Sequence, residues 1–110
     1  RLVPRNIAVG LMMTGRMASA VEMERYGLVN AVVPQDELDA EVDRWIADIL
    51  ASAPLCVQAI KSTVRETGEM PPDQAQAVRS PELIAALTSE DSLEGVRAFR
   101  EKRAPVWQGK

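Results

Sequence analysis

Apolar residues recur along much of this chain with the period of an amphipathic helix. After Asp36, which is suited to cap a helix N-terminus, six apolar side chains follow at steps of three and four residues. These residues are Leu38, Val42, Trp45, Ile46, Ile49 and Leu50. A second helix is predicted to begin at Pro54, a residue favoured in the first helical turn, and to end at Gly68.

The remaining helix signals are shorter and depend on capping residues. Ser19 and Glu22 have the spacing of a capping box, and Gly27 stands where a short helix would end with positive φ. The stretch "MPPDQAQAV" repeats the proline-led start, and Ser89 offers a cap for a final helix. Before that cap lies a short amphipathic stretch, whose apolar members are Leu83, Ile84 and Leu87.

The stretch "LVNAVV" at residues 28–33 is the single strand candidate, because it is rich in β-branched residues and bounded by Gly27 and Pro34. One strand cannot form a sheet by itself. We therefore expect it to pair with a segment outside this chain or to run extended. The predicted fold class is mainly α, with at most one short strand.

Size and composition favour one compact unit with a modest core, since the 110 residues are 46% hydrophobic. A net charge of −3 without histidine argues against a nucleic-acid partner. No apolar run approaches the roughly 20 residues of a membrane span, so no membrane partner is expected. The lone cysteine, Cys56, can form no internal disulfide, which favours a reducing cytoplasm. The opening at Arg1 without methionine suggests a piece of a longer protein.

The C-terminal stretch "SEDSLEGVRAFREKRAPVWQGK" sorts its charges along the predicted final helix. Glu90 and Asp91 lie in its first turn, and the cations Arg97, Arg100, Lys102 and Arg103 gather at its far end. This order by itself complements the helix dipole. The same cations beside Phe99 and Trp107 could instead bind a phosphate-bearing ligand and stack its ring. Composition does not decide between the two interpretations.

Two other features have ordinary explanations. Four methionines could line an acyl-chain pocket or pack in a core, namely Met12, Met13, Met17 and Met23. Cys56 is not expected to act as a nucleophile, because the chain has no histidine to deprotonate it. A metal site is not expected either, because zinc sites want several cysteine or histidine ligands.

Two separated stretches of the chain resemble the C-terminal part of the crotonase superfamily, the enoyl-CoA hydratase and isomerase family. The first stretch carries T-G-R at 14–16, Ser-Ala at 19–20, G-L-V-N at 27–30 and V-V-P at 32–34. The second carries S-E-D at 89–91, E-G at 94–95, A-F at 98–99, E-K-R at 101–103, then Pro105, Trp107 and Gly109. Between them lie A-P-L at 53–55 and Lys61. "EMP" at 69–71 and the "PVWQGK" ending are most similar to the subgroup that acts on carnitinyl thioesters.

The resemblance implies a ClpP/crotonase-like fold, with residues 1–34 ending the core in short helices and a short strand. Residues 35–110 would form the C-terminal helical oligomerisation region of a cytoplasmic homotrimer or dimer of trimers. Family enzymes are more than twice this length and hydrate, dehydrate or isomerise acyl-CoA thioesters through an enolate held in an oxyanion hole. Their catalytic groups lie upstream, so we assign no catalytic residue here and expect the 110-residue chain alone to be inactive. Coenzyme A is implied as part of the substrate, with no covalently bound cofactor.

The resemblance also implies that Phe99 and Lys102 approach the adenine and phosphate end of coenzyme A in an adjacent subunit. Their spacing of three would place both on one helix face. Core packing beside Leu93 and Val96 is the alternative for Phe99. Two other functions stay open: a stand-alone helical oligomerisation module without catalysis, and a small CoA-binding protein that uses the basic aromatic tail.

Overall fold

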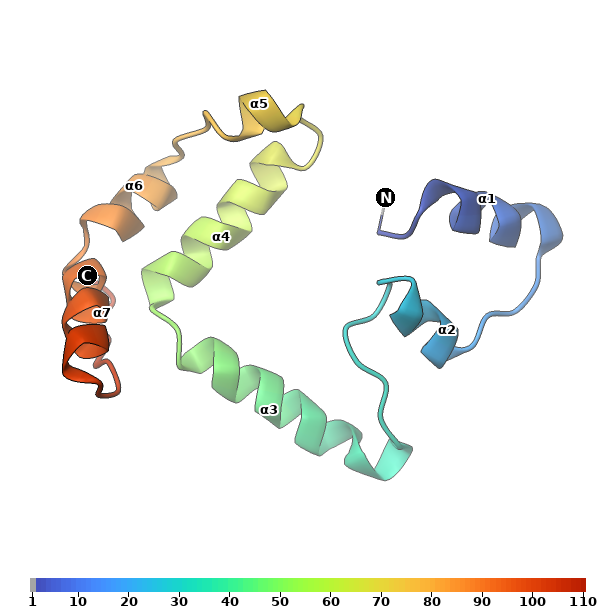
Figure 1. Ribbon diagram of the computed structural model, residues 1–110, viewed down its shortest axis with the longest axis horizontal. Helices are drawn as coiled ribbons and strands as arrows, with labels where there is room; N and C mark the ends of the chain where they lie inside the picture. Colours follow the sequence, from blue (N-terminus) through green and yellow to red (C-terminus); the bar gives the residue numbers. More distant parts are fainter. Residues whose placement is uncertain (1) are drawn as a thin grey trace. The chain divides into compact units, whose positions relative to one another are not determined.

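The computed structural model describes residues 2–110, and the regular elements in this range are all helical (Figure 1). They are α1 (Arg5–Thr14), α2 (Ala20–Arg25), the 3-10 turn η1 (Gln35–Glu37), α3 (Leu38–Leu50), α4 (Pro54–Thr67), α5 (Pro72–Ala75), α6 (Pro81–Thr88) and α7 (Glu90–Glu101). The described residues divide into two units, one reaching Val42 and the other spanning Asp43–Lys110. The predicted mainly α class is confirmed. The expected single compact unit is not found.

Helix α1 of the first unit was not predicted from the sequence. It follows Pro4 without any side-chain cap, and it contains Gly10, which is a poor helix former. It ends at Gly15, which has a φ of 62° and donates its N–H to the carbonyl of Leu11. The helix was missed because neither its start nor its interior carries a strong helix signal.

Helix α2 begins and ends as its capping residues predict. The Ser19 hydroxyl accepts the N–H of Glu22 at 3.2 Å, and Gly27 has a φ of 79°. The Glu22 carboxylate also holds the guanidinium of Arg16, which precedes the helix, through both of its oxygens. This pairing with Arg16 lowers the pKa of Glu22.

The expected strand at residues 28–33 is absent from the structure. The backbone bends at residues 28–30 and has no regular structure at 31–34. A strand needs a partner for its ladder of hydrogen bonds, and residues 2–110 offer none. The N–H of Val32 instead donates to the Glu24 carboxylate at 3.1 Å.

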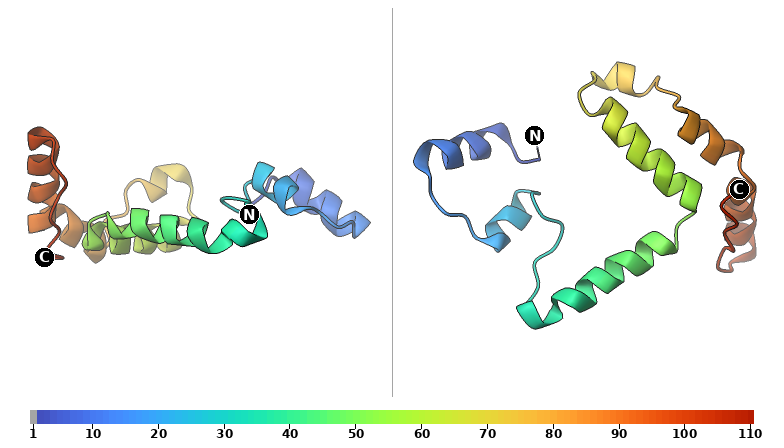
Figure 2. Two further views of the ribbon diagram at one scale, coloured as in Figure 1. Left: turned by 90° about the horizontal axis from the view of Figure 1, so that it is seen from below. Right: turned by 180° about the vertical axis from the view of Figure 1, so that it is seen from behind.

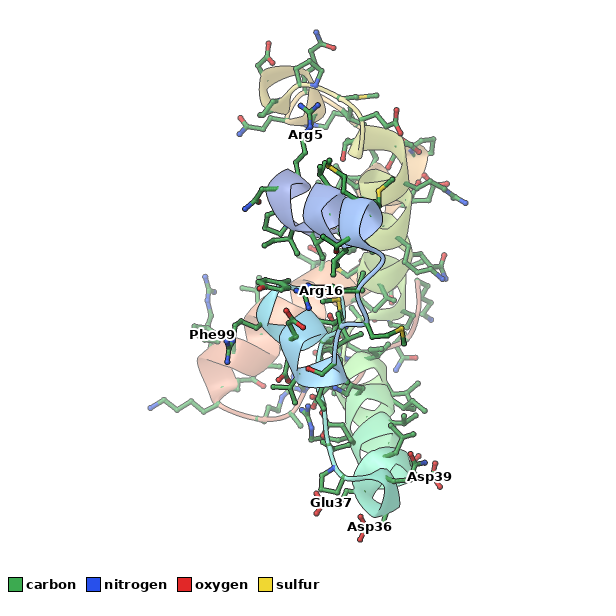
Figure 3. All side chains as sticks on the ribbon, turned by 90° about the vertical axis from the view of Figure 1, so that its right-hand side faces the viewer. Arg5, Arg16, Asp36, Glu37, Asp39 and Phe99 are labelled. Carbon is green, nitrogen blue, oxygen red and sulfur yellow. The ribbon has the colours of Figure 1, made fainter. Side chains whose placement is uncertain are left out.

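The helix predicted after Asp36 is present, but Asp36 does not cap it. The chain enters through η1, whose N-cap is Pro34 and has no side-chain cap bond, and α3 begins at Leu38. Asp36, Glu37 and Asp39 lie together at this entrance (Figure 3). Their negative charges complement the positive end of the helix dipole.

In the second unit, α4 packs beside α6, and α6 contacts α7 (Figures 1 and 2). Helix α4 starts at Pro54 and is followed by Gly68, as predicted. Its buried residues are Ala59 and Ser62, and the buried residue of α6 is Ala86. Small side chains thus allow the two helices to approach closely.

Among residues 2–110, the buried apolar side chains are all alanines. The buried hydrophobic residues of the described chain are Ala53, Ala59, Ala86 and Ala98. The apolar stripe of α3 remains between 39% and 75% exposed, and Ile60 and Val64 of α4 are also exposed. The stripe predicted from the periodicity therefore exists, but residues 2–110 do not cover it.

Candidate functional site

The C-terminal residues 103–110, here called the return segment, run back along α7. The helix begins after Ser89, whose hydroxyl accepts the N–H of Ser92 at 3.0 Å. The backbone N–H groups of Glu90 and Asp91 then donate to the carbonyl oxygen of Lys110, at 2.8 and 3.3 Å. The last residue of the return segment therefore satisfies backbone donors that a helix N-terminus leaves unpaired.

The side chain of Asp91 holds the return segment from within. Its carboxylate accepts the N–H groups of Gln108 at 2.6 Å and Gly109 at 2.9 Å, and the residue is only 1% exposed. The sequence assigned Asp91 to the helix dipole, and its position in the first turn agrees with that. Its contact with the return segment was missed, because no local pattern links residues 17 and 18 positions apart.

Trp107 anchors the middle of the return segment. Its indole N–H donates to the carbonyl of Ala51 at 2.7 Å, and its ring lies against Gly95 of α7. A methyl group on Gly95 would come within 3.4 Å of that ring. The part of the Trp107 ring nearest Gly95 therefore lies against the backbone of α7.

Glu94 and Arg103 form an ion pair through both oxygens of the carboxylate. The guanidinium nitrogens of Arg103 lie 2.6 and 3.0 Å from the two Glu94 oxygens, and its Nε lies 2.6 Å from Glu101. The N–H of Val106 also donates to Glu94, at 2.9 Å. Arg103 first, and the Val106 N–H second, lower the pKa of Glu94 to about 2.

The predicted CoA-binding residues Phe99 and Lys102 lie at the end of α7. Phe99 is 85% exposed (Figure 3), and Leu93 and Val96 are exposed as well, so packing in a core of this chain is not found. Lys102 follows the last helical residue with a φ of 52°. Lys102 is thus the C-cap of α7 rather than one of its helical residues, and the shared face with Phe99 stays a prediction.

The cations at the end of α7 divide into two groups. Arg103 is held by two carboxylates, whereas Arg100 and Lys102 have no ion-pair partner within residues 2–110. Arg97, Arg100 and Val96 also line a surface pocket of about 360 Å³ on α7. An exposed aromatic ring beside exposed cations suits a ligand that joins a flat ring to phosphate groups.

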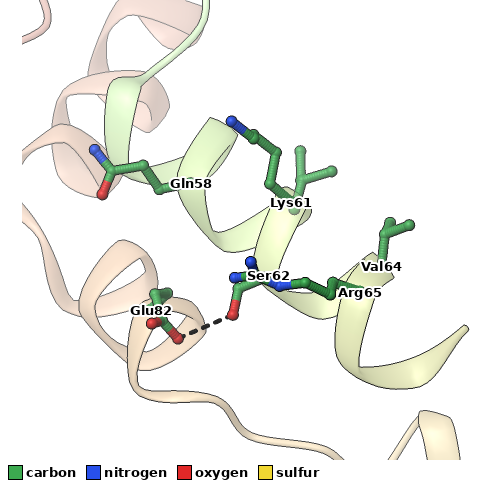
Figure 4. A pocket seen from close by; sticks show the side chains of 7 residues that line it. Gln58, Lys61, Ser62, Val64, Arg65 and Glu82 are labelled. Carbon is green, nitrogen blue, oxygen red and sulfur yellow. Dashed lines mark hydrogen bonds between the residues drawn. The ribbon is translucent and has the colours of Figure 1, made fainter.

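A second pocket, of about 630 Å³, lies where α4 faces α6 (Figure 4). Its lining residues are Gln58, Ile60, Lys61, Ser62, Val64, Arg65 and Glu82. The Ser62 hydroxyl lies 3.1 Å from Glu82 of α6 and 2.9 Å from Glu66 of its own helix. The backbone N–H of Glu82 and then Ser62 lower the pKa of Glu82. This polar contact joins the two helices at their small-residue seam.

Other site types find no support among the described residues. In residues 2–110, no group of three or more His, Cys, Asp or Glu side chains could hold a metal ion. The helices described here are all too short or too polar to cross a bilayer. Cys56 is exposed and forms no disulfide.

Comparison with known proteins places this geometry in a family. The family model for enoyl-CoA hydratase/isomerase matches residues 1–110. The chain belongs to the enoyl-CoA hydratase/isomerase family. Carnitinyl-CoA dehydratase of Salmonella typhi is 44% identical over 114 residues, a match that covers all of this chain and 44% of that protein.

Solved structures of family members are similar to this chain over nearly its whole length. Enoyl-CoA hydratase of Bacillus anthracis matches with a TM-score of 0.90 and 30% identity, over 100% of this chain and 43% of that chain. Enoyl-CoA hydratase of Mycobacterium tuberculosis H37Rv matches with a TM-score of 0.83 and 35% identity, over 99% and 43%. The resemblance drawn from the two motif stretches is thus confirmed, and the chain is a helical C-terminal part of the crotonase fold.

The chain spans 44% of the length of the curated relative. The similarity of "EMP" and "PVWQGK" to the carnitinyl subgroup agrees with the identity of that relative, a carnitinyl-CoA dehydratase.

Proposed function

We propose that this chain is the helical segment of an enzyme that hydrates, dehydrates or isomerises acyl-CoA thioesters. The acidic side chains and the oxyanion hole of that enzyme belong to a part of the protein outside residues 1–110. The segment supplies the contacts between subunits of a cytoplasmic trimer, or of a dimer of trimers, and it contributes to binding of coenzyme A. Carnitinyl-CoA is the acyl thioester favoured by the subgroup similarity.

The observation that carries this proposal is the exposure of the predicted apolar faces within a chain that matches the family over its whole length. Leu38, Trp45 and Ile49 of α3 are each at least 39% exposed. Burying a large apolar side chain contributes about 1.5–3 kcal/mol. Faces of this kind favour a role in assembly rather than in chemistry.

The CoA contact is proposed for Phe99 and Lys102. Phe99 offers an open aromatic face for the adenine ring, and base-on-aromatic stacking contributes about 1–3 kcal/mol. Lys102 offers an ammonium group without an ion-pair partner in residues 2–110, which suits a phosphate. Neither group needs to take part in the bond-making steps.

An activity assay tests the catalytic part of the proposal. The protein that carries this chain should convert crotonyl-CoA or carnitinyl-CoA, whereas residues 1–110 purified alone should convert neither. Light scattering should give a trimer or hexamer for the longer protein. Turnover of either thioester by residues 1–110 alone would contradict the proposal.

The exposed apolar faces also favour the second candidate, a stand-alone oligomerisation module. That candidate predicts that residues 1–110 alone form a defined trimer by light scattering and bind no coenzyme A by calorimetry. Monomeric or unfolded behaviour of the isolated chain would exclude it and leave the enzyme segment.

A further inference from the structure

The turn after α7 has an unusual residue at its critical position. The N–H of Arg103 donates to the carbonyl of Ala98 at 3.1 Å, and the N–H of Lys102 donates to that of Phe99 at 3.3 Å. This pair of bonds is the Schellman motif, whose left-handed position is usually glycine. Here that position is Lys102, with φ 52° and ψ 41°.

Lys102 is the one residue other than glycine with positive φ among residues 2–110. A side chain in this conformation crowds the backbone, so it persists where the surroundings hold it. Glycine would fit the turn without this strain. The strained position therefore indicates that the lysine side chain itself has a use there.

The structure beyond the turn is what holds Lys102 in place. Arg103, the next residue, is gripped by both oxygens of Glu94 and by Glu101. Glu94 also accepts the N–H of Val106, so one carboxylate binds two points of the chain that follow the turn. The Glu94 side chain is only 15% exposed, whereas that of Glu101 is 52% exposed. Glu94 is therefore the better-protected of the two anchors.

The same ion pair also determines which of the neighbouring cations is neutralised. Arg103 is neutralised by Glu94 and Glu101, while the ammonium group of the adjacent Lys102 has no partner within residues 2–110. A phosphate approaching this turn would thus meet Lys102 and Arg100, rather than Arg103, as its available cations. The contacts of Arg103 with Glu94 and Glu101, here called the clamp, hold the backbone that follows Lys102. They also keep both carboxylates bound to Arg103 rather than to the lysine.

From these contacts we infer that Glu94 is a positioning residue for Lys102: by clamping Arg103 and Val106 it holds the left-handed turn that directs the lysine toward the phosphates of coenzyme A. The inference rests on the proposed CoA contact of Lys102. Glu94 itself does not touch the ligand. Loss of the clamp would let the turn relax and would release the lysine from its fixed direction.

Calorimetric titration of the protein that carries this chain tests the inference, with coenzyme A and pantetheine as the two ligands. Pantetheine lacks the nucleotide phosphates, so it reports the rest of the binding site. We expect K102M to raise the Kd for coenzyme A about tenfold and to leave pantetheine unchanged. E94Q should raise the Kd for coenzyme A at least threefold, also without effect on pantetheine. In the K102M background, E94Q should add nothing further.

Glu90 provides the matched control, because its side chain on the same helix is 71% exposed and lies away from the turn. E90Q should leave both Kd values unchanged. If E94Q does not fold, as judged by its thermal unfolding, R103Q removes the same clamp from the other side and should give the same pattern.

The outcomes separate the inference from the function on which it rests. An unchanged Kd for coenzyme A in K102M would overturn the proposed CoA contact. A raised Kd for coenzyme A in K102M together with an unchanged Kd in E94Q would overturn the positioning role alone. The positioning role would also be overturned if E94Q raised the Kd for pantetheine as much as the Kd for coenzyme A. It would likewise be overturned if E94Q raised the Kd for coenzyme A by the same factor with and without K102M.

Discussion

The carboxylate of Asp91 binds the backbone N–H of Gln108 at 2.6 Å, which ties the start of α7 to a residue seventeen positions later. The same carboxylate binds the N–H of Gly109, and the N–H of Asp91 itself binds the carbonyl of Lys110. Asp91 is almost completely buried by these contacts. The return segment is therefore held at its far end by one side chain of α7.

Replacing Asp91 by asparagine should release this end of the return segment. The amide of asparagine has one acceptor oxygen, so one of the two N–H groups would lose its partner and face another donor. Leaving a buried donor unpaired costs about 1–3 kcal/mol, and D91N should lower the free energy of urea unfolding by this amount. Hydrogen exchange of the Gln108 and Gly109 N–H groups should become faster in parallel.

The exposed neighbour Glu90 is the control for D91N. Its carboxylate is 71% exposed and lies 4.0 Å from the Lys110 ammonium group, an arrangement that contributes little. E90Q should change the free energy of unfolding by less than about 0.5 kcal/mol. Equal effects of D91N and E90Q would mean that helix-dipole charge, rather than the contact with the return segment, explains Asp91.

Local signals in the sequence predicted the elements that depend on local chemistry. Ser19, Pro54 and Ser89 mark helix starts in the structure as they do in the sequence, and the apolar period located α3. Helix α1 was missed because Pro4 offers no side-chain cap bond. The strand at residues 28–33 was overpredicted, because β-branched residues indicate a strand only where another strand can pair with it.

The candidate site was less accessible from the sequence than the helices were. Phe99 and Lys102 came from the family resemblance, and their exposure is consistent with a binding role that remains a prediction. The contacts of Asp91 and Glu94 with the return segment, and that of Trp107 with Ala51 after α3, join positions 9 to 56 residues apart. Periodicity and capping rules act over three or four residues, so they cannot reveal such contacts.

Gly95 should tolerate alanine but not a large side chain. An added methyl group would meet the Trp107 ring at 3.4 Å, which is ordinary van der Waals contact, and alanine favours a helix interior over glycine by about 1 kcal/mol. G95A should therefore raise the free energy of unfolding by up to about 1 kcal/mol. G95L should displace the ring, break the indole bond to Ala51 and shift the tryptophan fluorescence toward that of an exposed indole. A destabilised G95A with unchanged G95L fluorescence would contradict this packing.

The ion pair of Glu94 should make stability depend on acid pH. The pKa of Glu94 falls from its ordinary 4.5 to about 2 in the folded chain, chiefly through Arg103. A lowered folded pKa stabilises fully above the unfolded value and is lost as the pH falls toward the folded value. The stability of the protein should therefore decline from about pH 4.5 toward pH 2.

The variant E94Q isolates this contribution. Thermal midpoints should be measured between pH 6 and pH 3. At pH 6 the midpoint of the parent protein should be higher than that of E94Q, and this gap should narrow as the pH falls. Glu22 and Glu82 also have lowered pKa values, so E94Q should still lose some stability in acid. A gap that stays constant across this range would show that folding does not lower the pKa of Glu94.

Lys102 and Gly27 both have a positive φ, of 52° and 79°, but the first position holds a side chain and the second does not. Glycine adopts this conformation freely, whereas a side chain there costs roughly 1–2 kcal/mol. K102G should therefore raise the free energy of urea unfolding, by about 0.5–1 kcal/mol once the greater freedom of glycine in the unfolded chain is subtracted. G27A should lower it by roughly 1 kcal/mol. Destabilisation by K102G would mean that contacts of the lysine side chain outweigh the strain, and the argument that its position serves a ligand would lose its physical basis.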